Sequence, residues 1–93
     1  HDAIREHWNV IQKCDVVLVL NYDKNGIKGY IGGNSFLEMG FAYILNKPIC
    51  LLNPAPEIPY YDTEIKAMKP LIIHGDLKKV LVTFSNQKIS KGG

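Results

Sequence analysis

The sequence predicts an α/β protein with a short parallel sheet of about three strands. Three apolar runs of three to five residues alternate with segments of helical periodicity, at 16–20, 49–52 and 71–73. Strands that alternate with helices are typical of βα units. The runs are continuously apolar instead of alternating, which indicates strands buried on both faces of a sheet. With 93 residues, the chain is expected to form one domain.

The predicted elements, in chain order, are a helix over about 3–13, a strand over 16–20, a loop over 21–33, a helix over about 35–46, a strand over 49–52, a proline-rich loop over 53–59, a short helix over 62–68, a strand over 71–73, a helix over 77–84 and a flexible tail over 85–93.

The first helix and the first loop have clear local signals. Asp2 is a suitable N-cap, and apolar side chains follow at helical spacing, at Ile4, Trp8 and Ile11. The loop over 21–33 contains four glycines among charged and polar residues, which excludes regular structure there.

Prolines and capping residues delimit the second half of the chain. Pro48 ends the central helix, because proline lacks an N–H and clashes with the preceding turn. Three prolines in six residues, at positions 54–59, exclude a helix or a central strand. Asp62 and Asp76 are suitable caps for the last two helices. The polar stretch after Phe84 predicts a frayed tail.

Composition and charge exclude several classes of protein. The net charge of +2 is too balanced to indicate a nucleic-acid polymer as partner. No apolar run approaches the roughly 20 residues of a membrane helix, and no signal peptide is evident. Cys14 and Cys50 border apolar runs, so we expect buried thiols and a reducing, cytoplasmic setting. The two cysteines lack metal-ligand spacing, so no metal is expected. No cofactor is expected either. Because the chain opens at His1, we expect it to be N-terminally incomplete.

Polar residues follow the predicted strands, at Asn21, Asp23, Asn53, His74 and Asp76. Ligands of open parallel sheets bind beyond the carboxyl ends of the strands, so these side chains mark a candidate site. The alternative is that they are polar only because they lie in loops.

The stretch from Gly32 to Glu38 carries the strongest chemical signal. Gly32 and Gly33 allow close approach to a ligand, and with Asn34 and Ser35 they lead into a helix N-terminus that favours anions. Glu38 is the only charged residue between Lys28 and Lys47, in a helix that is otherwise apolar. It either lies at the lip of a pocket or forms a capping box with Ser35.

These residues resemble the nucleoside 2-deoxyribosyltransferase family. The resemblance covers about residues 3–52 and is carried by Cys14-Asp15 before an apolar strand, the glycine-bearing loop, Phe36-Leu37-Glu38-Met39-Gly40-Phe41-Ala42, and Lys47-Pro48-Ile49. The chain is similar, more distantly, to the cytokinin-activating phosphoribohydrolases, whose Gly-Gly and Thr-x-x-Glu pattern Gly32-Gly33 and Ser35-x-x-Glu38 echo.

The resemblance implies a flavodoxin-like or Rossmann-like three-layer α/β/α fold. It also implies cleavage or transfer at the N-glycosidic bond of nucleosides or nucleoside 5′-monophosphates, with Glu38 as nucleophile. A carboxylate is suited to trap the anomeric carbon of an oxocarbenium-like transition state. Family members build their sites with a neighbouring subunit, so a homo-oligomer is expected.

Several other residues are candidates for the same site. Asn21 is suited to bind a hydroxyl or base edge with Gly32, Gly33, Asn34 and Ser35. Asp23 is a candidate general acid or sugar contact, or else shapes a turn. His7 is a candidate acid or base, or else a structural residue of the helix face.

The chain departs from the family pattern in three ways. The first family strand and helix are missing, His7 replaces a usual aspartate, and Gly32 replaces an acidic or hydroxyl residue. Two alternatives to an enzyme therefore remain, a non-catalytic nucleotide- or phosphate-binding module and an inactive fragment of a larger enzyme.

Overall fold

The computed structural model describes residues 2–85 and 87–92 as four helices and four strands. In chain order the elements are α1 (Ala3–Lys13), β1 (Val16–Val19), α2 (Gly33–Ile44), β2 (Ile49–Leu51), α3 (Asp62–Ala67), β3 (Leu71–Ile72), α4 (Leu77–Thr83) and β4 (Ile89–Gly92).

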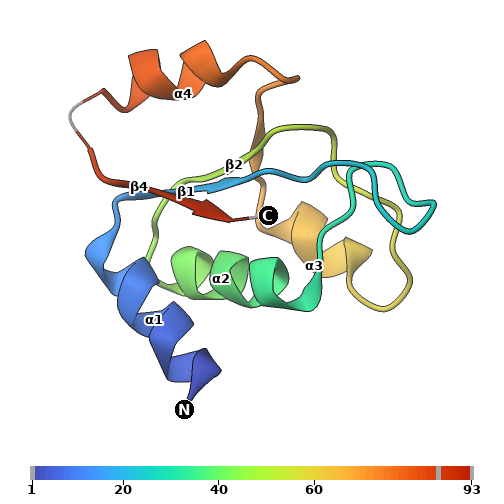
Figure 1. Ribbon diagram of the computed structural model, residues 1–93, viewed down its shortest axis with the longest axis horizontal. Helices are drawn as coiled ribbons and strands as arrows, with labels where there is room; N and C mark the ends of the chain where they lie inside the picture. Colours follow the sequence, from blue (N-terminus) through green and yellow to red (C-terminus); the bar gives the residue numbers. More distant parts are fainter. Residues whose placement is uncertain (1, 86, 93) are drawn as a thin grey trace.

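The strands form one parallel sheet in the order β3-β2-β1-β4. Helices α1, α2 and α3 lie on one face of the sheet and α4 lies on the other (Figure 1). The predicted α/β class with a three-layer α/β/α arrangement is therefore confirmed. None of the helices among the described residues has the length and apolar character needed to cross a bilayer.

Each face of the sheet has its own apolar cluster, because parallel strands bury side chains on both sides. Val17, Val19 and Leu51 pack toward α1, α2 and α3, while Val16 and Leu18 pack toward α4. All four residues of β1 are buried, as its continuously apolar run predicts.

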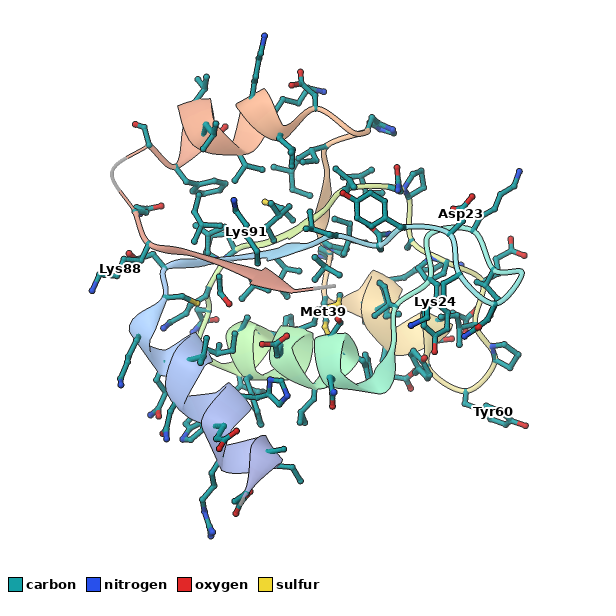
Figure 2. The ribbon with its side chains drawn as sticks, in the orientation of Figure 1. Asp23, Lys24, Met39, Tyr60, Lys88 and Lys91 are labelled. Carbon is teal, nitrogen blue, oxygen red and sulfur yellow. The ribbon has the colours of Figure 1, made fainter. Side chains whose placement is uncertain are left out.

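The prediction of a flexible tail over 85–93 is wrong for Ile89–Gly92, which form β4 and pair in parallel with Val16–Val19 of β1. Positions 86 and 93 of that prediction lie outside the described residues. Of the residues of β4, Ile-Ser-Lys-Gly, only Ile89 favours strands, and one such residue is too weak a local signal to predict the strand. The strand instead depends on a distant partner. The Asp15 carboxylate accepts a hydrogen bond from the Lys88 N–H at 2.8 Å, and the Asp15 and Val16 N–H groups donate to the Lys88 carbonyl. In Figure 2, Lys88 is labelled just before this strand and Lys91 within it.

Candidate functional site

Glu38 and His7 meet at the interface between α1 and α2. The Trp8 and Phe41 rings pack edge to face with centroids 5.1 Å apart, and this contact aligns the two helices. His7 precedes Trp8, Glu38 lies one turn before Phe41, and His7 Nδ1 is 3.3 Å from Glu38 Oε2. The side chains are 28% and 12% exposed, so the pair is partly shielded from water. Two predicted catalytic residues are therefore in direct contact.

The other carboxylate oxygen of Glu38 faces β4. A Cβ built at Gly92 would lie 3.0 Å from Glu38 Oε1 and 3.8 Å from Ser35 Oγ. Only glycine fits this close approach without displacing the carboxylate. Glu38 thus lies between His7 on one side and the main chain of β4 on the other.

This position coincides with the switch point of the sheet. The connection that leaves β1 runs through α2 to β2, on one side of β1, whereas β4 pairs on the other side. In open parallel sheets, ligands bind beyond the carboxyl ends of the strands at the point where the strand order reverses, which here is between β1 and β4. Gly92 is the last residue of β4, so Glu38 lies at this end of the β1–β4 pair.

The capping-box alternative for Glu38 is wrong, because α2 begins at Gly33 and not at Ser35. Gly32 is the N-cap, and its carbonyl accepts the Phe36 N–H at 2.9 Å. Ser35 is therefore the third residue of the helix, and Glu38 lies in the second turn, beyond reach of the N-cap. The glycine pair allows this earlier start because glycine is tolerated at an N-cap.

The predicted binding residues at the start of α2 differ in accessibility. Gly33 and Asn34 are exposed, Gly32 is half-buried and Ser35 is buried. Tyr61 supports this turn from α3, since its hydroxyl donates to the Ile31 carbonyl at 2.7 Å and its ring stacks on Phe36. Burial raises the pKa of the Tyr61 hydroxyl, and the neighbouring Tyr30 raises it further.

Asn21 lies in the interior and not at a free surface. Its side chain is 0% exposed, and its amide nitrogen lies within hydrogen-bond distance of the carbonyls of Gly29, Asn53 and Pro54. Its amide oxygen accepts the Asn53 N–H at 2.9 Å. The polar atoms that were predicted to contact substrate are therefore used to join two loops.

Asp23 is separate from the Glu38–His7 pair. Its carboxylate accepts the Gly29 N–H at 3.0 Å, which is the turn-shaping role that the sequence left open. Asp23 also lines a cleft of about 700 Å³ between the loops after β1 and β2, and neither His7 nor Glu38 lines that cleft.

Gly92 and the cleft residues of the proline-rich loop are the parts of these sites that sequence reasoning misses. Gly92 belongs to a strand that the local sequence does not predict. The residues of the proline-rich loop predict turns, and nothing in their pattern indicates that they line a cleft. No three His, Cys, Asp or Glu side chains in the described part of the chain are arranged to hold a metal ion. Comparisons of the chain with protein-family models, with curated proteins and with solved structures each find no match.

Proposed function

We propose that the chain breaks the N-glycosidic bond of nucleosides or nucleoside 5′-monophosphates, with Glu38 as the nucleophile. The observation that carries this proposal is the His7–Glu38 contact of 3.3 Å at the switch point of the sheet. An acidic side chain in an otherwise apolar helix is costly to bury unless it is paired. Its pairing with an imidazole, and not with the helix end, leaves it available for chemistry.

The proposed reaction has two steps. A Glu38 oxygen forms a bond to the anomeric carbon as the carbon–nitrogen bond breaks, and the base leaves with the electron pair and takes up a proton. Water, or a second base, then displaces the carboxylate from the anomeric carbon and restores it.

His7 acts as a positioning residue in this proposal. In this proposal the His7 ring, whose Nδ1 lies 3.3 Å from Oε2, fixes the direction of the carboxylate and leaves Oε1 as the attacking oxygen. Oε1 is the oxygen that faces Gly92.

Base release from a panel of ribonucleosides, deoxyribonucleosides and their 5′-monophosphates tests the proposal, with and without a second free base. We expect wild-type protein to release base from at least one class, and Glu38→Gln to release none. The matched control is Glu64→Gln, because Glu64 is an exposed carboxylate on α3. Absence of release by the wild type, or equal release by Glu38→Gln, contradicts the proposal.

The role of His7 is tested separately. His7→Ala is expected to lower kcat about 100-fold through loss of carboxylate orientation. His7→Asn retains an N–H near the Nδ1 position and is expected to recover part of the loss. A His7→Asn protein as slow as His7→Ala, with both folded, contradicts the positioning role.

A non-catalytic nucleotide-binding module is the second candidate. It is favoured by the start of α2, where the N-cap glycine has no side chain to occupy the free N–H groups and the next two residues are exposed. This function predicts thermal stabilisation by nucleotides without base release.

A further inference from the structure

The cleft that Asp23 lines is a second candidate site, and we call it the loop cleft. It has a volume of about 700 Å³, with Asp23 and residues 26–29 on one wall and residues 53–57 on the other. Asp23, Lys24 and Tyr60 mark the end of the molecule where these two loops lie (Figure 2). The volume is within the range of about 300–1,000 Å³ that small-molecule sites occupy.

The two walls are held in a fixed arrangement. Asn21 joins them from beneath, with donors to Gly29 and Pro54 on opposite walls. Asn25 and Gly26 both have positive φ and form the tight turn that the Lys24–Ile27 bridge closes. Pro54 and Pro56 stiffen the facing wall. A ligand that enters this cleft therefore does not have to order its walls, which favours binding.

Part of the main-chain donor capacity of the lining is already used. Pro54 and Pro56 have no N–H. The N–H groups of Ile27, Gly29 and Asn53 are already used, by the Lys24 carbonyl, the Asp23 carboxylate and the Asn21 side chain. Five of the ten lining residues thus offer no free main-chain donor.

The same lining is rich in acceptors and has excess negative charge. Asp23 and Glu57 contribute two carboxylates, against the single ammonium of Lys28. Both acidic side chains belong to exposed residues, whereas Ile27, Ala55 and Pro56 supply half-buried or buried apolar surface. Two carboxylates of exposed residues, together with apolar surface in the same cleft, suit a ligand with an apolar body and a cationic, hydrogen-donating group.

We propose that the loop cleft binds a small organic amine in its protonated form, with the ammonium group between Asp23 and Glu57. This site is distinct from the Glu38–His7 pair, and the proposal does not depend on any glycosidase activity.

Three indole probes of nearly equal size, which differ in charge, test the proposal. Tryptamine is cationic, tryptophol is neutral and indoleacetate is anionic. Amide chemical shifts of the isotope-labelled chain are followed during titration with each probe. We expect tryptamine to produce saturable shifts within residues 26–29 and 53–57, and to bind at least about tenfold more tightly than tryptophol and indoleacetate, because only it supplies a cationic donor.

Charge variants locate the ammonium group. Asp23→Asn keeps an oxygen that can accept the Gly29 N–H, so the loop is retained while the charge is lost. We expect Asp23→Asn and Glu57→Gln each to weaken tryptamine binding about fivefold, and Lys28→Met to strengthen it. Glu64→Gln, outside the cleft, is expected to leave the affinity unchanged.

Several outcomes overturn the proposal. These are equal or tighter binding of indoleacetate, the absence of saturable shifts with tryptamine, shifts centred outside both loops, and unchanged affinity in both carboxylate variants. Because base release is not measured, a failed glycosidase assay does not affect this result.

Discussion

Single side chains decide which of the predicted site residues can reach a ligand. The sequence identifies Glu38 and His7 separately, but their pairing depends on how α1 packs on α2, which no local pattern contains. Asn21 follows its strand as predicted, but its amide group donates hydrogen bonds to carbonyls of two loops and is not available to a ligand. The sequence places a residue at the edge of the sheet but cannot determine where its polar atoms bond.

At Gly29 the main chains of the two loops approach closely. Gly29 has φ of +64°, and a Cβ there would lie 2.5 Å from the Pro54 carbonyl oxygen. We expect Gly29→Ala to lower the free energy of unfolding by about 3 kcal/mol, because backbone strain adds to a clash between main-chain groups. Urea unfolding measures the loss.

Gly26→Ala is the matched control for this substitution. Gly26 has φ of +74°, but a Cβ there meets nothing within 4 Å. Only the conformational cost remains, and we expect a loss of about 1 kcal/mol. Equal losses at the two positions would show that the Gly29–Pro54 approach has no energetic role.

Elements whose own residues carry helix or strand signals are predicted correctly from the sequence. Elements that form only because a distant partner is present are not. Helix α1 follows its Asp2 cap, whose carboxylate accepts the Arg5 N–H at 3.0 Å, and its apolar stripe. Strand β4 has neither a cap nor an apolar run, and is formed by the edge of β1. The start of α2 differs from prediction because glycine serves as its N-cap, where the sequence favours Ser35.

The carboxyl end of α1 is capped by the side chain of Lys47, which lies in the connection between α2 and β2. Lys47 Nζ donates to the carbonyls of Ile11, Gln12 and Cys14, at 2.6, 2.8 and 2.6 Å. A cation at a helix carboxyl end is stabilised by the unpaired carbonyls and the helix dipole. This contact holds the carboxyl end of α1 in place, one to two turns beyond His7.

We expect Lys47→Met to reduce the free energy of unfolding by about 2 kcal/mol, because three carbonyls lose a charged donor. Lys13→Met is the control, since Lys13 is an exposed lysine in the last turn of the same helix. Its loss is expected to stay near 0.5 kcal/mol. If Lys47→Met lowers the free energy of unfolding no more than Lys13→Met does, the Lys47 cap does not stabilise α1.

The molecule as a whole consists of a sheet with an apolar cluster on each face, and this much follows from the continuously apolar strand sequences. The position of β4 at the edge of the sheet does not follow, because pairing between distant segments has no counterpart in local sequence. Each cluster contains one cysteine, Cys14 on the side of α1 and Cys50 on the side of α4.

These thiols make the stability of the fold sensitive to alkaline pH. Burial raises the pKa of Cys14 and of Cys50 above the ordinary 9.0. Below 9.0 both thiols stay protonated in the folded and the unfolded chain, so their contribution is fully present. As pH rises above 9.0 the unfolded chain releases these protons first, and the free energy of unfolding falls.

Urea unfolding at neutral pH and at several values above 9.0 measures this dependence. Cys50→Ala removes one of the buried thiols, so its stability is expected to fall less steeply with pH than that of the wild type. Identical slopes for the two proteins would show that the thiols do not cause the alkaline loss.

The pairing of β4 with β1 has a consequence for biosynthesis. Strand β1 precedes its partner β4 by more than 70 residues, and the Asp15–Lys88 hydrogen bond spans 73 positions. A nascent chain on the ribosome therefore has one unpaired edge of β1 until residues 89–92 emerge. We expect a chain arrested before residue 89 to remain sensitive to protease and to bind chaperones, and emergence of residues 89–92 to end both properties.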